Sequence, residues 1–274
     1  MLIHARRFSI AVLVALVALS AMSALSATSV LAQSPSSTLA PTGTLRGVFL
    51  GSNPVQGRVN TATGEATGPV PDLVRELAKR IGVGSKVIPA PDAAGVIRAL
   101  NDGSADIGFL AYDETRAREV DFGAPFAVML NSYLVKAGSP IRSSADVDRA
   151  GITVAAVKGQ TQELFVSRTL KTAKVRVFQT MPAQAEVERL LTSGEVDAFA
   201  INRQRSLEAE AASASKLSAL PDSFLEVDQS FVVSKGSRAK LDAIAKFMSE
   251  LNAGGFMQQS IDRAKLTGVR APRR

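Results

Sequence analysis

The chain has 274 residues, of which 46% are hydrophobic, 21% are charged and 5% are aromatic, and its formal net charge is +7 at pH 7. This composition is typical of a globular protein long enough for one large domain or two smaller ones. There is no cysteine, which excludes disulfides, thiolate metal sites and cysteine nucleophiles. The only histidine, His4, lies near the start. Its removal with a targeting segment would also exclude histidine-based zinc sites and general bases.

Residues 1–32 follow the three-part pattern of a secretory signal peptide. Two arginines form the positive beginning, residues 8–25 are uncharged and rich in Ala, Val and Leu, and residues 30–32 supply the small side chains of a cleavage site before Gln33. The alternative is a retained membrane anchor, because the apolar run is long for a signal. Its serines and the lack of following stop-transfer charges favour cleavage. We therefore expect secretion into the periplasm, without a lipid anchor because no cysteine follows the cut.

The positive charge does not indicate nucleic-acid binding. Lys and Arg are spread along the chain among Asp and Glu, without interleaved aromatic residues. The one dense cluster is formed by Arg270, Arg273 and Arg274, which we expect to be a solvated tail. A basic secreted protein would instead favour small anionic ligands by long-range attraction.

Strand and helix signals alternate along the rest of the chain. Residues 33–42 are rich in Ser, Thr and Pro and predict a flexible leader. A short apolar run predicts a strand at 44–50, and four glycines with few apolar neighbours predict a loop over 51–68. The elements expected next are a helix over 71–81, a strand at 86–88, a helix capped by Asp92, a strand at 105–110 and a turn capped by Asp113.

After residue 122 the alternation starts again. Further strands are predicted at 133–135, 152–157, 175–178, 197–201 and 230–234. Further helices are predicted at 143–147, 161–170, 183–191, from Arg203 onward, 238–251 and 256–265. Strands that alternate with helices of this length indicate an α/β fold with mainly parallel sheets, and two such sets indicate two lobes.

Six segments follow one another in an informative order. They are GTLRGVF, TGPVPDLVRELAKRIG, ALNDGSADIG, DETRAREVDFGAPF, ADVDRAGITVAAVKGQTQE and LLTSGEVDAFAINR. Together, over residues 43–269, they resemble the bacterial periplasmic solute-binding proteins of family 3, the polar amino-acid type that serves ABC importers. Each segment alone is weakly specific, whereas six in the same order behind a signal peptide are characteristic of the family.

The resemblance implies a two-lobe, type II periplasmic-binding-protein fold with the ligand bound between the lobes. Lobe one would be residues 43–130 with 231–274. Residues 131–230 would hold the two crossing hinge strands and lobe two, whose core would be 136–222. The resemblance further implies capture of a small anionic or zwitterionic ligand and docking on an inner-membrane ABC permease. We expect a monomer, with no cofactor, metal, nucleic acid or catalysis.

Arg116 is the first candidate ligand-binding residue. A guanidinium stays charged, and its planar fork of donors matches a carboxylate. Family members bind the α-carboxylate of their ligand with an arginine in this turn, and the resemblance implies that Arg116 is the equivalent residue. The alternative is an ion pair on the lobe surface with Asp113, Glu119 or Asp121.

The turn formed by Gly159, Gln160 and Thr161 is the second candidate. It lies between a predicted strand and a predicted helix, where free backbone N–H groups and the helix dipole favour an anion. Family members bind the same carboxylate with this turn. The alternative is simple capping of the helix by Thr161, and the two roles are compatible.

Other candidate positions depart from the family pattern. Asn202 stands where family members carry an aspartate that binds the ligand's ammonium, and Ala111 stands in place of a hydroxyl residue. Ala93 and the region of Ser52 and Asn53 stand in place of aromatic clamps. Asn202 can accept a hydrogen bond from an ammonium but lacks the charge-assisted part, which is roughly half of the strength. These departures favour a small carboxylate that need not carry an ammonium.

The stretch from Asp106 to Arg116 is about two residues shorter than in the family. Two aromatic residues flank the turn in this stretch. Phe109 and Tyr112 are alternative clamps, although Phe109 equally fits a buried strand and Tyr112 a partly exposed position. Three aspartates at predicted strand ends are expected to be structural caps: Asp106, Asp121 and Asp197.

Two functional classes stay open from the sequence. The first is a binding protein for an amino acid, a derivative or an organic acid, in which Glu65 or Asp72 is an alternative partner for an ammonium. The second is a periplasmic enzyme of the dehydratase kind, or a ligand sensor, because a fold does not fix a function. An enzyme needs a carboxylate with a shifted pKa in the cleft, and the candidates are Glu65 and Glu163.

Overall fold

In a computed structural model of the chain, the described residues are 34–272, so the expected signal peptide and the last two arginines lie outside them. From Pro35 onward the chain forms one compact unit. Within residues 34–272, no helix combines the length and the apolar character needed to cross a membrane.

β1 (Thr44–Leu50) is the middle strand of the first half of the main sheet. It pairs in parallel with β4 (Gly84–Ala90) on one side and with β5 (Ile107–Ala111) on the other. The helices α3 (Pro69–Ile81) and α4 (Ala93–Asn101) connect these strands. The predicted strands and helices of this region are therefore confirmed, in the spatial order β4-β1-β5.

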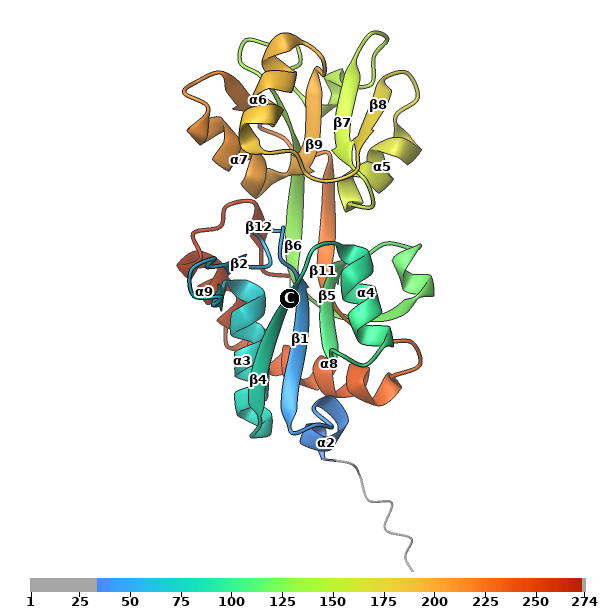
Figure 1. The fold of residues 1–274 in the computed structure, drawn as a ribbon, viewed down its shortest axis with the longest axis vertical. Coiled ribbons are helices and arrows are strands. Elements are labelled where there is room, and N and C mark those ends of the chain that lie inside the picture. The colour runs from blue at the N-terminus through green and yellow to red at the C-terminus, as the bar shows by residue number, and fades with distance from the viewer. Residues whose placement is uncertain (1–33, 273–274) are drawn as a thin grey trace, which may run out of the picture. The chain divides into compact units, whose positions relative to one another are not determined.

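Two long strands continue from this half of the sheet into the other half. β6 (Val120–Lys136) and β11 (Leu225–Ser234) pair with each other in antiparallel fashion, and Figure 1 shows both running between the two halves. The sequence predicts a new start of the alternation after residue 122, with a strand only at 133–135. Gly123 and Pro125, residue types that ordinarily interrupt a strand, lie in between. The structure instead shows one strand of 17 residues, and its register shifts opposite Pro125. An irregularity of this kind accommodates a proline inside a ladder.

β7 (Thr153–Val157) is the middle strand of the second half. It pairs in parallel with β8 (Lys174–Phe178) and β9 (Ala198–Asn202), and β9 pairs with β6 in antiparallel fashion. The connecting helices are α5 (Thr161–Thr169) and α6 (Gln184–Ser193). The spatial order β8-β7-β9 repeats the order β4-β1-β5, as expected for two lobes of the same α/β type.

Helices and short strands complete the fold after β9. α7 (Arg203–Ala212), α8 (Arg238–Ala253) and α9 (Phe256–Arg263) confirm the predicted helices. β10 (Leu217–Ala219) and β12 (Val269–Arg270) both pair with β6. These two strands are missing from the sequence prediction because two or three residues carry no periodic pattern.

The expected solvated tail is only partly a tail. Arg270 belongs to β12 and forms an ion pair of 2.6 Å with Glu226 on β11. Arg273 and Arg274 lie outside the described residues. The sequence shows the charge of this cluster but not the strand pairing that buries part of it.

Smaller elements also differ from the expectation. The second part of the expected leader forms the short helix α2 (Pro35–Leu39), and Leu39 is buried in the apolar core, so this part is not a free leader. The predicted loop over 51–68 contains a hairpin of β2 (Arg58–Val59) and β3 (Ala66–Thr67). The predicted turn after Asp113 is a 3-10 helix, η1 (Arg116–Arg118), and the helix predicted at 143–147 is the short 3-10 helix η2 (Ser144–Asp146).

Separate apolar clusters fill the two halves of the molecule. Two clusters pack around β1, α3, α4 and α8, and we call this half lobe one; two others pack around β7, β9, α5 and α6, and we call this half lobe two. On β6, Phe126 and Met129 belong to lobe one, whereas Tyr133 belongs to lobe two. Between them lie Asn131 and Ser132, both fully buried. A polar step on the crossing strand therefore separates the two cores.

The aspartates at strand ends make structural contacts. Asp106 accepts hydrogen bonds from the Arg46 backbone and guanidinium at 2.7–3.0 Å. Asp121 accepts from the Gly236 N–H, and Asp197 accepts from the backbone of the strand beside it. Asp92 caps α4 by accepting from the Gly95 N–H, as the sequence predicts. These carboxylates pin strand ends and helix starts.

We predict that Phe109→Ala destabilises the fold strongly. Phe109 has no exposed surface and its ring lies 4.8 Å from that of Phe231 and 5.5 Å from that of Phe126. Removal of a buried aromatic ring costs about 3–5 kcal/mol of unfolding free energy. Urea denaturation should show this loss, whereas Tyr112→Ala, at a side chain that is 49% exposed, should cost about 1 kcal/mol or less. Equal losses in the two variants would contradict the placement of Phe109 in the core.

Candidate functional site

The strand order is the same in both lobes, so equivalent strand ends meet the point where the winding reverses. In both lobes the chain winds to one side of the middle strand and then to the other, and ligands of such sheets bind beyond the carboxyl ends of the strands where the winding reverses. In lobe one these ends lead into residues 51–53 and 112–116, and in lobe two into residues 158–161 and 203–205. The candidate residues from the sequence are therefore concentrated at these four strand ends.

Arg116 crosses from lobe one to lobe two. Its guanidinium donates to the Ala111 carbonyl at 2.9 Å in its own lobe, and to the Gly159 carbonyl at 2.7 Å and the Thr161 hydroxyl at 3.4 Å in the other. The side chain is buried. None of the ion pairs within residues 34–272 includes Arg116, so the surface ion pair considered from the sequence is absent there.

The turn before Arg116 is held by Asp113. Its carboxylate accepts from the Thr115 N–H at 2.8 Å and from the Arg168 guanidinium of lobe two at 3.1 Å. Burial by itself would raise the pKa of Asp113, but the hydrogen bond from Thr115 and the charges of Arg116 and Arg168 outweigh it and lower that pKa. Burial lowers the pKa of the Arg116 guanidinium, against the opposing charge of Asp113.

The second candidate, the turn before α5, already binds a carboxylate of its own helix. Gly159 has a positive φ of 70°, and its N–H donates to the Glu163 carboxylate at 3.1 Å. The other oxygen of Glu163 accepts from the Ser167 hydroxyl at 2.9 Å. Gln160 is the N-cap of α5 and makes no side-chain cap bond, so the expected capping by Thr161 is not what closes this end. Glu163 therefore acts as a local cap, not as an isolated acid.

Asn202, in lobe two, lies opposite the loop after β1 in lobe one. We call the region where the two lobes contact each other the junction. Its side-chain oxygen caps α7 by accepting from the Arg205 N–H at 2.8 Å, and its amide faces the Asn53 side-chain oxygen at 3.5 Å. The same oxygen of Asn53 also accepts from the Val55 N–H at 3.1 Å. Beside them, the Arg205 guanidinium donates to the Ser52 carbonyl at 2.8 Å. Both asparagines are buried.

Two pairs of hydrogen-bonded amide side chains lie near the contact between the lobes and are absent from the sequence interpretation. Gln162 donates to the Asn131 side chain at 2.5 Å, and Asn131 lies opposite Asn202 in the pairing of β6 with β9. In lobe one, Gln56 donates to the Gln229 side chain at 3.1 Å. Within residues 34–272, the side-chain amide nitrogen of Gln229 is buried without a hydrogen-bond partner. These four residues lie outside the predicted strands, and no short-range pattern says which polar residues meet.

The aromatic clamp candidates lie in different environments. Phe109 is completely buried among other phenylalanines, which matches the core position that the sequence equally allowed. Tyr112 is exposed, and its ring packs edge-on against Phe122 at 5.1 Å. Ala93, at the start of α4, packs against an apolar cluster of lobe one.

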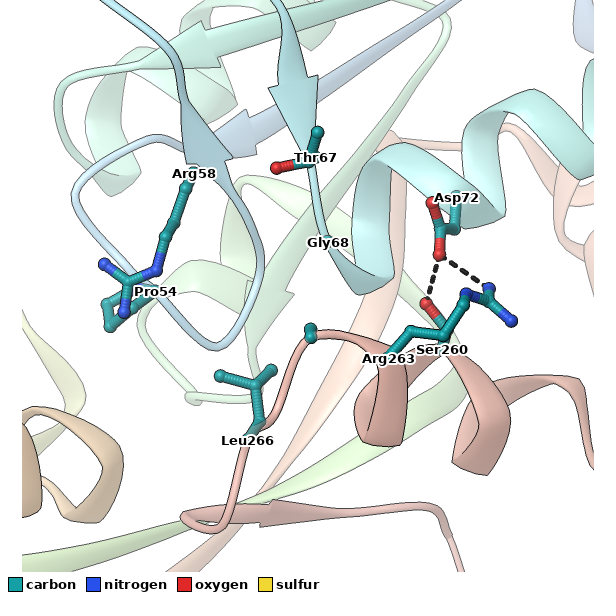
Figure 2. Close-up of a pocket in the computed structure, with 9 residues that line it drawn as sticks. Pro54, Arg58, Thr67, Gly68, Asp72, Ser260, Arg263 and Leu266 are labelled. Carbon is teal, nitrogen blue, oxygen red and sulfur yellow. Dashed lines mark hydrogen bonds and ion pairs between the residues drawn. The ribbon is translucent and has the colours of Figure 1, made fainter.

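The alternative acids are engaged elsewhere. Asp72 accepts from the Ser260 hydroxyl at 2.5 Å and from the Arg263 guanidinium at 2.8 Å, in a pocket of about 260 Å³ that Figure 2 shows between the start of α3 and α9. Glu65 is exposed and lies 4.0 Å from Arg75. Neither acid contacts Asn202.

Gln204 of lobe two also contacts the C-terminal segment. The Gln204 side-chain oxygen, at the start of α7, accepts from the Thr267 N–H at 2.8 Å and the Gly268 N–H at 3.2 Å. The Gly268 carbonyl in turn accepts from the Leu130 N–H on β6. The start of α7 in lobe two therefore packs directly against the C-terminal segment at Gly268.

Comparisons with known proteins give a consistent result. A model of the bacterial extracellular solute-binding proteins, family 3, matches residues 48–264. A glutamine-binding protein of Geobacillus stearothermophilus is 31% identical over 147 residues, which cover 52% of this chain and 55% of that protein. The match thus spans about half the length of this relative.

Solved structures match over most of the chain. A putative binding component of an ABC transporter from Wolinella succinogenes, complexed with lysine, is 25% identical with a TM-score of 0.70, over 81% of this chain and 95% of that one. An ancestral amino acid-binding protein, described as a precursor of cyclohexadienyl dehydratase, is 24% identical with a TM-score of 0.69, over 84% and 99%. At this identity the latter likeness shows the fold alone.

We predict that Gly268→Ala holds the junction open. A Cβ atom at residue 268 would lie 2.2 Å from the Gln204 backbone nitrogen, closer than such atoms approach, so the start of α7 has to move away. Small-angle scattering should give a larger radius of gyration than for the wild type. Gly254→Ala is the matched control, because its new Cβ would meet its nearest neighbour at 3.6 Å. An unchanged radius in Gly268→Ala would show that this contact does not set the closure.

Proposed function

The chain belongs to the bacterial extracellular solute-binding proteins of family 3, and we propose that it captures a small carboxylate-bearing ligand between its lobes for an ABC importer. In this proposal the protein works as a monomer in the periplasm, after removal of residues 1–32, and docks on an inner-membrane permease. The hinges near residues 131–136 and 222–230 would let lobe one (43–130 with 231–274) close on lobe two. The separate apolar clusters of the two halves support this division.

The observation that carries the proposal is the environment of Arg116. The guanidinium is buried at the junction and donates its hydrogen bonds to neutral oxygens, namely two carbonyls and a hydroxyl. The charge of Asp113 offsets part of the effect of burial, but no carboxylate within residues 34–272 forms an ion pair with Arg116. A buried cation without a paired anion is costly. A ligand carboxylate would replace neutral acceptors by charge-assisted hydrogen bonds, which are roughly twice as strong. Ligand binding would therefore relieve a cost that the protein alone carries.

The contacts of Asn202 support a ligand that needs no ammonium. Asn202 and Asn53 bind each other through neutral groups, and no carboxylate in the described residues contacts either side chain. The alternative acids, Glu65 and Asp72, are held in other contacts. An ammonium placed here would lose its water without gaining a counter-charge.

Binding is favoured over catalysis by the same contacts. Glu163, one of the two acids considered for catalysis, is used by the Gly159 and Ser167 hydrogen bonds of its own helix. The other candidate, Glu65, is exposed. The enzyme alternative has a fold-level neighbour in the precursor of cyclohexadienyl dehydratase. Recovery of the ligand after incubation separates the two functions: unchanged ligand supports binding, and conversion supports the enzyme.

We predict that the protein prefers a deaminated ligand to its amino acid. Calorimetry should compare glutamine with glutaramate, which lacks only the ammonium, and wild-type affinity for glutaramate should be higher by about tenfold or more, or ~1.4 kcal/mol. In Asn202→Asp, the ratio should move towards glutamine by about ten- to hundredfold, because a charged hydrogen bond contributes about 1.5–3 kcal/mol. Aspartate caps a helix as well as asparagine does, so α7 should stay intact.

Controls at Arg116 test the carboxylate assignment itself. Arg116→Ala should weaken both ligands by about 2–5 kcal/mol, and Arg116→Lys should also bind poorly because an ammonium lacks the bidentate fork. A wild type that prefers glutamine strongly would contradict the ammonium-independent ligand. Unchanged affinities in Arg116→Ala would contradict the proposed function as a whole.

A further inference from the structure

Two arginines cross the junction in opposite directions. Arg116 reaches from lobe one to the Gly159 carbonyl of lobe two, and Arg205 reaches from lobe two to the Ser52 carbonyl of lobe one, at 2.7 and 2.8 Å. Each carbonyl belongs to a segment that follows the middle strand of its lobe, β7 or β1. The two guanidiniums therefore occupy equivalent places at the two switch points.

Arg205 has no carboxylate partner. Its guanidinium makes one hydrogen bond within residues 34–272, to the Ser52 carbonyl, and none of the ion pairs of this range includes it. The nearby Glu208 is already bound by the Arg58 guanidinium and by the Gln204 amide. Burial lowers the pKa of Arg205, and the charge of Glu208 only partly opposes this effect.

Arg205 lies beside Asn202 and the loop after β1. The backbone N–H of Arg205 donates to the Asn202 side-chain oxygen. The Asn202 amide faces Asn53, and Asn53 follows Ser52, whose carbonyl accepts from the Arg205 guanidinium. A cationic ligand group here would meet another cation. An anionic group would meet a guanidinium, with amides around it as further donors.

The two arginines belong to one polar layer. Thr161, which accepts from Arg116, is followed by Gln162, and Gln162 bonds Asn131, the cross-strand neighbour of Asn202. The layer consists of polar groups and contains two cations without ion pairs. The two acids in this layer are engaged elsewhere: Asp113 forms an ion pair with Arg168, and Glu163 accepts from the Gly159 N–H at the start of its own helix.

We propose that Arg205 is a second anion-binding residue and that the ligand is a dicarboxylate, with one acidic group on Arg116 and the other on Arg205. This inference rests on the proposed function, because it assumes that the first carboxylate binds to Arg116. A dianion neutralises both guanidiniums, whereas a monoanion on Arg116 leaves the partly buried guanidinium of Arg205 on a neutral carbonyl. The fork of Arg205 would exchange the Ser52 carbonyl for a carboxylate, as Arg116 exchanges the Gly159 carbonyl.

Four ligands that differ in two groups test the inference by calorimetry. Glutarate and glutaramate have the same length, but only glutarate carries the second carboxylate; glutamate and glutamine repeat this difference with an ammonium added. The wild type should bind glutarate about ten- to hundredfold more tightly than glutaramate, the range that one charge-assisted contact gives. Glutarate should be the tightest ligand of the four.

Variants of Arg205 assign the preference to this side chain. In Arg205→Gln, glutarate and glutaramate should bind equally, whereas Arg205→Lys should keep part of the preference because it keeps the charge. Arg176→Gln is the matched control: it removes one arginine on β8 that pairs with Glu195, and the preference should be unchanged. Thermal unfolding without ligand shows whether each variant is folded.

The outcomes separate this inference from the proposed function. Glutaramate binding that Arg116→Ala abolishes, with no preference for glutarate in the wild type, overturns the role of Arg205 and leaves the proposed function standing. A glutarate preference that survives in a folded Arg205→Gln variant also overturns it. Failure of all four ligands to bind, or binding that does not depend on Arg116, overturns the proposed function as well.

Discussion

The buried guanidinium of Arg116 is the constraint on which the rest of the junction depends. It is charged at any physiological pH, yet its hydrogen-bond acceptors are two carbonyls and a hydroxyl instead of a carboxylate. Neutral oxygens satisfy the donors of a guanidinium without cancelling its charge. The junction therefore contains a positive charge that no ion pair neutralises. A ligand anion can neutralise it, which is why the geometry of the fold favours capture of such a ligand.

The repeated topology explains why this deficit arises at one place. The carboxyl ends of β1 and β5 in lobe one and of β7 and β9 in lobe two carry the polar segments, while the apolar side chains are kept in separate clusters on either side. On β6 the change from one core to the other takes place at Asn131 and Ser132. Because the buried contacts between the lobes are polar, their strength depends on what charge lies between them.

The sequence predicts the local elements well and the contacts between distant elements poorly. The strand at 44–50 and the cap at Asp92 follow from short-range patterns and are confirmed. The length of β6 does not follow, because Gly123 and Pro125 look like breakers when the partner strand is not known. Arg116 could be chosen by its motif, whereas Arg205 lies in an ordinary helical pattern, and only the fold places it beside Ser52.

A crystal structure of the protein grown with glutarate tests the central claim most directly. The account predicts one carboxylate within about 2.7–2.9 Å of two guanidinium nitrogens of Arg116, and the other carboxylate on Arg205. The Gly159 and Ser52 carbonyls would then no longer accept from these side chains. Glutarate bound elsewhere, with Arg116 still donating to the Gly159 carbonyl, would contradict the account.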